Sequence, residues 1–139
     1  MIFVDTWAWI GLADDTDQYH DAVVKQHRKH LKKYRNYVTT DYVVGELIDY
    51  LYDATPEPQA RDFIRALLAK ANTKILQIVH VSPDYFHRAW DMRQKYDDKP
   101  DISFVDFTSM VVMQELGITD VFTGDDHFRQ VNLGFRLSP

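Results

Sequence analysis

The sequence predicts an α/β fold in which a parallel β-sheet of four to five strands is flanked by helices. Short apolar runs rich in Val, Ile and Phe alternate along the chain with longer segments of helical periodicity. Strands that alternate with helices pair in parallel, because each crossover returns the chain to the same edge of the sheet. Polar residues directly follow two of the apolar runs, and functional residues gather at the carboxyl ends of parallel strands. The length of 139 residues suits one domain, residues 1–139.

The first half of the chain is predicted to contain two strands and three helices. Its first strand is a short apolar run that ends on a carboxylate, and two prolines within residues 55–58 break the chain further on. Thr and Asp side chains are available to cap the helix that follows the second strand. In order, the predicted elements are a strand at residues 2–5, a turn, an amphipathic helix at Asp17–Lys33, a strand at Asn36–Thr39, a helix capped by Thr40 or Asp41 that runs to about Asp53, and a helix at Gln59–Lys70.

The second half is predicted to contain two buried strands, two long helices and a terminal edge strand. Ser103 caps one of these helices and Gly117 ends it. That helix is apolar nearly all round, which indicates burial. In order, the predicted elements are a strand at Lys74–Val81, a helix from Ser82-Pro83 to about Tyr96, a polar loop at residues 96–101, a helix at Phe104–Leu116, a strand at Asp120–Thr123, a short helix after residues 124–126, and an edge strand at Phe135–Leu137.

The amino-acid composition excludes or disfavours several classes of protein. A content of 45% hydrophobic and 14% aromatic residues is typical of a globular protein. The absence of cysteine excludes a disulfide framework and any thiolate ligand or nucleophile. No secretory signal and no apolar run of about 20 residues is visible, so we expect a cytoplasmic protein without a membrane segment. The net charge of -5 argues against general nucleic-acid coating, although residues 25–35 form a local basic run.

Four carboxylates lie in apolar surroundings or at junctions where a charge is unexpected: Asp5, Glu46, Asp106 and Asp125. Each has an ordinary interpretation. An Asp after a strand forms turns or caps helices, a Glu on a helix is solvated, and an Asp in a buried helix pairs with Lys or Arg. The helix at Phe104–Leu116, however, contains no basic residue for Asp106.

Convergence of these carboxylates would require a cation, since they cannot all ionise together in a dry pocket. Mg²⁺ or Mn²⁺ suits oxygen ligands. Zinc is disfavoured, because cysteine is absent and the six histidines form no His-x-x-x-His pair beside a carboxylate. An acidic Mg²⁺ or Mn²⁺ site acts most naturally on phosphodiesters.

Several stretches match known motifs in order along nearly the whole chain. They are Ile2-Phe3-Val4-Asp5-Thr6, Tyr19-His20-Asp21-Ala22, Val38 to Leu47 with Gly45-Glu46 near its end, Ile102 to Phe107, and Val121-Phe122-Thr123-Gly124-Asp125-Asp126-His127-Phe128. Together these stretches resemble the PIN domain family, specifically the VapC-type toxin ribonucleases.

The resemblance implies a Rossmann-like PIN fold and a metal-dependent endoribonuclease. It assigns the catalytic, metal-binding quartet to Asp5, Glu46, Asp106 and Asp125, and supporting polar roles to Thr6, Ser103 and Thr123. It further implies a homodimer, an RNA substrate and a small antitoxin protein as partner.

Three residues near these motifs allow two interpretations each. Trp7 stands where the family usually has a small polar residue, and it is predicted to pack against the helix at Asp17–Lys33; a stacking face for an RNA base is the alternative. Asp126 could replace Asp125 as fourth ligand, but the motif spacing favours Asp125. His127 is predicted to be a surface residue at a helix start, with an acid or base role beside Asp125 as the alternative.

The basic run can be read as a solvated helix face or as an RNA track formed by Lys25, Arg28, Lys29 and Lys32. Three alternatives to a toxin ribonuclease stay open at this point. They are a non-catalytic PIN-like module that binds RNA or protein, an RNA-processing nuclease without a toxin role, and a haloacid-dehalogenase-like phosphohydrolase. The last requires a second Asp two residues after the first, where Trp7 stands.

Overall fold

The computed structural model describes residues 1–139 and contains five strands and seven helices. The strands are β1 (Ile2–Val4), β2 (Tyr37–Thr40), β3 (Leu76–Val79), β4 (Asp120–Phe122) and β5 (Arg136–Leu137). The helices are α1 (Thr6–Ala13), α2 (His20–Lys33), α3 (Asp41–Ala54), α4 (Glu57–Ala69), α5 (Pro83–Lys95), α6 (Phe104–Leu116) and α7 (His127–Gln130).

All five strands form one parallel sheet in the order β3-β2-β1-β4-β5. Phe3 of the central strand β1 is level with Val38 of β2 on one side and with Val121 of β4 on the other. The chain builds outward from β1 through β2 to β3, then returns to add β4 and β5 on the opposite side. The direction of winding therefore switches between β1 and β4, and ligands of open α/β sheets bind at the carboxyl ends of strands at such a point. The predicted parallel α/β architecture is confirmed.

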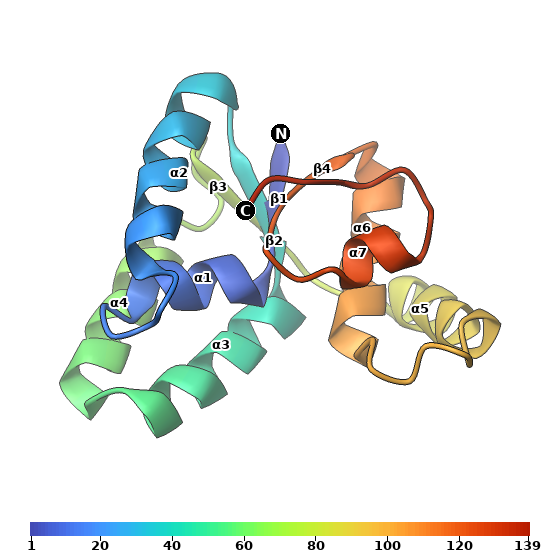
Figure 1. Ribbon diagram of the computed structural model, residues 1–139, viewed down its shortest axis with the longest axis horizontal. Coiled ribbons are helices and arrows are strands. Elements are labelled where there is room, and N and C mark those ends of the chain that lie inside the picture. The colour runs from blue at the N-terminus through green and yellow to red at the C-terminus, as the bar shows by residue number, and fades with distance from the viewer.

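Helices cover both faces of the sheet. Figure 1 shows α1, α2, α3 and α4 on one side of the strands and α5, α6 and α7 on the other. The largest fully buried side chains include Phe3 and Phe122 from the sheet, with Phe107 and Phe128 from the second helical layer. This apolar interior supplies the main driving force for folding. None of the seven helices is both long and apolar enough to cross a lipid bilayer.

Helix α1 occupies residues for which the sequence predicts a turn, so that prediction was wrong. Its sequence, TWAWIGLA, has no polar face that would reveal a helical period. Most of its residues are buried, since the helix packs against both α2 and α3. A helix enclosed on most sides is apolar all round, and periodicity cannot separate it from a buried strand or turn.

Helix ends agree with the predictions where a side chain caps them. The hydroxyls of Thr40, Ser82 and Ser103 accept backbone N–H bonds at the starts of α3, α5 and α6, and Gly117 ends α6 in the left-handed conformation. Helix α2 instead begins three residues later than predicted, and β3 is shorter than predicted at both ends. Helix α4 begins earlier than predicted because proline is accepted in a first turn.

The contact between α1 and α2 depends on the absence of a side chain at Gly11. A Cβ added there would lie 2.7 Å from Cγ2 of Val23. We expect Gly11→Ala to lower the free energy of unfolding by about 1–3 kcal/mol, because the added methyl overpacks a β-branched neighbour. Urea denaturation measures the effect.

Gly45→Ala is the matched control, since an added Cβ in α3 meets nothing within 4 Å. This variant should be more stable than wild type by up to about 1 kcal/mol, from helix propensity alone. Equal effects of the two substitutions would contradict the packing argument.

Candidate active site

Asp5 stands at the carboxyl end of β1 and at the N-cap position of α1, but its side chain caps nothing. No side-chain cap bond is made, while the Asp5 carbonyl accepts the N–H groups of Ala8 and Trp9. The residue is only 3% exposed. A buried carboxylate that neither caps a helix nor pairs with a base needs another explanation. The ordinary interpretation of Asp5 as a helix cap is therefore excluded.

Thr123 joins Asp5 to the turn that follows β4. Its hydroxyl donates to Oδ2 of Asp5 (2.8 Å) and accepts the N–H of Asp125 (3.0 Å). One fully buried hydroxyl thus fixes the carboxylate that ends β1 and the backbone that carries the next carboxylate. The contact exists because β1 and β4 are neighbouring parallel strands.

Asp106 lies in the first turn of α6 and is oriented by Ser103. The Ser103 hydroxyl accepts the N–H of Asp106 (3.1 Å), and the Ser103 N–H donates to Oδ2 of Asp106 (3.3 Å). This reciprocal capping box holds the carboxylate at the helix start. The residue is 7% exposed and pairs with no Lys or Arg.

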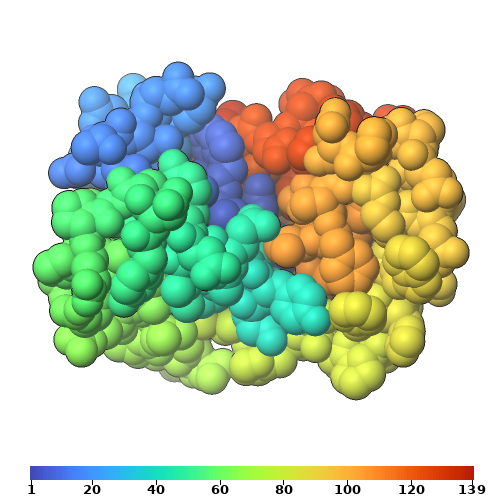
Figure 2. All heavy atoms as spheres, turned by 90° about the horizontal axis from the view of Figure 1, so that it is seen from below, coloured from blue at the N-terminus to red at the C-terminus, as the bar shows by residue number.

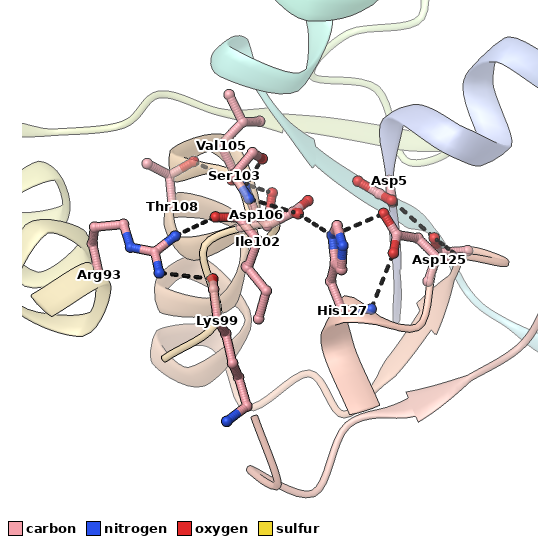
Figure 3. A network of polar contacts seen from close by, with 12 residues as sticks. Asp5, Arg93, Lys99, Ile102, Ser103, Val105, Asp106, Thr108, Asp125 and His127 are labelled. Atoms are coloured by element: carbon pink, nitrogen blue, oxygen red, sulfur yellow. Dashed lines mark hydrogen bonds and ion pairs between the residues drawn. The ribbon is translucent and has the colours of Figure 1, made fainter. Parts of the chain in front are cut away.

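Arg93 of α5 holds the loop that leads to Ser103. Its guanidinium donates to the carbonyls of Tyr96 (2.6 Å), Lys99 (2.8 Å) and Ile102, and it lies 4.7 Å from the ring centroid of Phe107. Figure 3 shows this guanidinium at one end of a chain of polar contacts that reaches Asp106 and Asp125. The polar loop predicted at residues 96–101 is therefore tied down at several points.

His127 connects Asp106 to Asp125. Its Nδ1 lies 2.8 Å from Oδ2 of Asp106 and 3.1 Å from Oδ2 of Asp125, and its backbone N–H donates to Oδ1 of Asp125. Figure 3 shows the imidazole between the two carboxylates, with Asp5 beside them. His127 begins α7, as predicted, but its side chain is only 22% exposed because the turn after β4 folds the ring inward against α6, so the predicted surface position was wrong. The Asp-x-His spacing was the available signal.

The pocket makes ionisation of its acids unfavourable. Burial, then the charge of Asp106, raises the pKa of Asp5 to about 7, although the Thr123 hydroxyl opposes the shift. Burial likewise raises the pKa of Asp106, and the hydrogen bond from His127 opposes it. Because desolvation and like charge act together, the group has a net affinity for a positive ion.

The donor set could hold a metal ion. Ligand atoms of Asp106, Asp125 and His127 lie within 4.8 Å of one another, and this cluster could hold a metal ion. The hydroxyl of Thr6, next to Asp5, is buried and has no hydrogen-bond partner in the protein. An unpartnered buried hydroxyl beside carboxylates is what a site leaves for a hydrated ion or a substrate oxygen.

Other predicted residues lie around this cluster. Glu46 is exposed on α3 and makes no hydrogen bond or ion pair with the other acids, so its role as a ligand stays a prediction. Asp126 pairs with Arg129 and is not a member of the cluster. Figure 2 looks toward the carboxyl ends of the strands and shows a central hollow between the aqua start of α3, the orange start of α6 and the red segment after β4.

Trp7 packs against Tyr19, which lies within the predicted helix at Asp17–Lys33 but just before the observed start of α2, and also against the turn after β4. Its ring centroid lies 5.2 Å from that of Tyr19. Its indole covers Gly124, the residue before Asp125. The basic residues predicted to track RNA are exposed, lie along α2 and form no ion pairs: Lys25, Arg28, Lys29 and Lys32.

Known proteins resemble this chain in both sequence and architecture. Residues 2–133 match the PIN domain family. The 23S rRNA-specific endonuclease VapC20 of Mycobacterium tuberculosis is 31% identical over 131 residues, which are 92% of each chain. The crystal structure of Mycobacterium tuberculosis VapC20, a sarcin-ricin loop cleaving toxin, superposes with a TM-score of 0.84 at 26% identity, over 98% of this chain and 97% of that one. A chain of a toxin-antitoxin complex from Klebsiella pneumoniae superposes with a TM-score of 0.68 at 14% identity, over 100% and 97% of the two chains, and supports the fold alone.

The raised pKa of Asp5 predicts that the metal-free protein loses stability as the pH rises. The folded state keeps the Asp5 proton up to about pH 7, whereas an unfolded Asp releases it near pH 3.9. The folded state therefore binds more protons between these values, and the free energy of unfolding falls across this window by up to about 4 kcal/mol.

Asp5→Asn should remove this slope, because the amide cannot ionise and its oxygen can still accept from Thr123. In EDTA at pH 8 the variant should unfold at a higher temperature than wild type, and at pH 4 the difference should vanish. Thermal melts at both pH values measure this, with Asp126→Asn as the exposed control. Parallel melting curves for wild type and Asp5→Asn would refute the prediction.

Proposed function

This chain belongs to the PIN domain family, and from that premise we propose that it is a metal-dependent endoribonuclease of the VapC type, the toxin of a toxin–antitoxin pair. One observation carries the proposal. Asp5, Asp106 and Asp125 come from three separate segments and lie close enough at the switch point of the sheet for their charges to interact, and no Lys or Arg neutralises them. A protein with only a structural use for these positions would be more stable with apolar residues there.

The proposed ion is Mg²⁺ or Mn²⁺, held by Asp5, Asp106 and Asp125, with Glu46 as the fourth predicted ligand. Oxygen donors without thiolates favour these hard cations over zinc. When bound, such an ion acidifies water and neutralises the charge that builds on a phosphodiester under attack.

The protein's own groups prepare the site. Thr123 and Ser103 aim the carboxylates of Asp5 and Asp106 through the hydrogen bonds described above. Nδ1 of His127 lies within hydrogen-bond distance of both Asp106 and Asp125 and links the two carboxylates. The free hydroxyl of Thr6 is available to donate a hydrogen bond to a substrate oxygen. Because these groups are fixed before substrate arrives, little reorganisation accompanies the reaction.

RNA is the proposed substrate, and a structured ribosomal loop is the proposed target. The support is the 31% identity to a 23S rRNA-specific endonuclease and the similarity to a sarcin-ricin loop cleaving toxin. The exposed basic residues of α2 form a stripe that suits a phosphate backbone: Lys25, Arg28, Lys29 and Lys32. A cytoplasmic location follows from this substrate.

Two partners belong to the same proposal, a small antitoxin that keeps the enzyme inactive and a second copy of the chain. Both rest on membership of the VapC group. Co-expression with the antitoxin should relieve growth arrest caused by the chain alone, and Asp106→Asn should relieve it without any partner. An RNA-processing nuclease without a toxin role would cause no growth arrest.

Replacing a clustered carboxylate should abolish RNA cleavage. Asp106→Asn removes a proposed ligand, and we expect its loss to exceed the ~10–100-fold effect typical of outer-shell partners. The ends produced from ribosomal RNA in Mg²⁺ measure this, and EDTA should abolish the same cuts in wild type.

Asp126→Asn is the matched control, because this neighbouring Asp is exposed and paired with Arg129. It should cleave within about twofold of wild type, as expected for a residue outside the cluster. Wild-type cleavage by Asp106→Asn, or cleavage that persists without divalent ions, would refute the proposed function.

The α2 stripe should contribute to RNA affinity through counterion release. Replacing Lys25, Arg28, Lys29 and Lys32 together by Ala should make the plot of log affinity against log salt shallower by roughly 0.7 per lost phosphate contact on single-stranded RNA. At low salt KM should rise while kcat is unchanged, because these contacts are uniform binding. Lys95→Ala on α5, across the sheet, is the control. An unchanged salt slope in the stripe variant would show that the stripe is only a solvated helix face.

A further inference from the structure

Trp7 lies on the turn that carries the catalytic groups after β4. A Cβ built on Gly124 would be 2.3 Å from Cζ2 and 2.6 Å from Cε2 of the indole. Gly124 stands between Thr123, which binds Asp5, and Asp125, which contacts His127. The six-membered ring of the indole is therefore in direct contact with the wall of the acidic pocket.

Tyr19 extends this aromatic surface toward the basic helix. The rings of Trp7 and Tyr19 are tilted by 42°, and Tyr19 is 44% exposed. The Tyr19 N–H donates to Oδ2 of Asp17 (3.0 Å), and the next residue, His20, bonds to the carbonyl of Gly11 (2.7 Å). Tyr19 directly precedes α2, so the pair connects the turn after β4 with the N-terminal end of the helix that carries the basic stripe.

Trp7 packs against the edge of the hydrophobic core without being fully buried in it, and Tyr19 lies outside the core. Trp9, two residues beyond Trp7, is buried and donates its indole N–H to the Thr39 hydroxyl (3.3 Å). Trp7 stays partly exposed, and the Trp7 indole N–H and the Tyr19 hydroxyl have no hydrogen-bond partner in the protein. A partly exposed aromatic pair with free donors resembles a binding surface more than a packing contact.

We propose that Trp7 and Tyr19 form a stacking site for an unpaired RNA base that flanks the cleaved phosphodiester, an inference that rests on the proposed ribonuclease function. Single-stranded RNA is bound by aromatic rings for the bases and cationic side chains for the backbone. Here the aromatic pair joins the turn of the acidic cluster to the first residue of α2, so a strand that runs from the acids toward this helix would meet the two rings.

The site should act on binding and not on the chemical step. Alanine substitution of a base-stacking ring weakens binding by roughly 5- to 150-fold. Because the same stacking exists in the ground state and the transition state, its loss should raise KM and leave kcat unchanged. A ring that only supports the Gly124 turn would instead alter kcat.

The binding test uses proteins that carry Asp106→Asn, so that the RNA stays intact. The probe is a stem–loop RNA with the sarcin-ricin loop sequence of 23S rRNA, together with copies in which one loop base at a time is replaced by an abasic site. With the Trp7 and Tyr19 side chains present, one abasic position near the cut should weaken binding by roughly 5- to 150-fold. With Trp7→Leu added, intact RNA should bind more weakly by a similar factor, and that abasic position should cause no further loss.

Kinetics on the active enzyme provide the second measurement. Trp7→Leu and Tyr19→Leu should raise KM with kcat within about twofold of wild type, and Trp7→Phe should recover most of the loss because a ring is restored. Trp90→Leu, which replaces an exposed Trp on α5, should change neither constant. Tyr19→Leu keeps the test decisive if Trp7→Leu folds poorly, since the atoms nearest Gly124 belong to Trp7.

The outcomes separate this inference from the proposed function. The stacking site is refuted if an abasic site weakens RNA binding equally with and without the Trp7 ring, or if both Leu variants keep the wild-type KM. The proposed nuclease function stands in either case, provided that cleavage depends on Asp106. If Asp106→Asn cuts RNA as well as wild type, both fail.

Discussion

Repulsion among buried carboxylates is the constraint on which the other features of the site depend. Asp5 and Asp106 are almost fully enclosed, and Asp125 is close enough to raise the pKa of both. Such a group persists only if neighbouring dipoles and a cation offset the desolvation. The hydroxyl of Thr123 and the imidazole of His127 supply part of that compensation, and a bound cation would supply the rest.

The sheet topology makes this arrangement possible. Because β1 and β4 are adjacent and parallel, the residues after their carboxyl ends meet at one edge, and Thr123 can reach Asp5 across the strand pair. The third carboxylate arrives on α6, whose start is fixed by Ser103 and by the loop that Arg93 ties down. Rigid strand ends and a capped helix position ligands more accurately than free loops would.

The sequence predicts those parts of the molecule that local signals determine. Apolar runs locate the strands, and Ser103 and Gly117 mark both ends of α6. Helix α1 could not be predicted from hydrophobic periodicity, because a buried helix needs no polar face. The inward orientation of His127 could not be predicted, because its partner Asp106 is 21 residues earlier and the contact forms only when α7 turns back onto α6. The exposed position of Glu46 likewise depends on the placement of α3, which no pattern in its own segment specifies.

Trp7 and Gly124 illustrate how one substitution can link recognition to the catalytic framework. An indole at position 7 is compatible with position 124 only if that residue has no side chain, since a Cβ there would overlap the ring. The two positions are therefore coupled, although 116 residues lie between them in the chain. A smaller residue at position 7 would relax the demand for glycine at position 124, but it would also remove the aromatic face beside Tyr19. The geometry that closes one wall of the acidic pocket thus also fixes an aromatic surface at its rim.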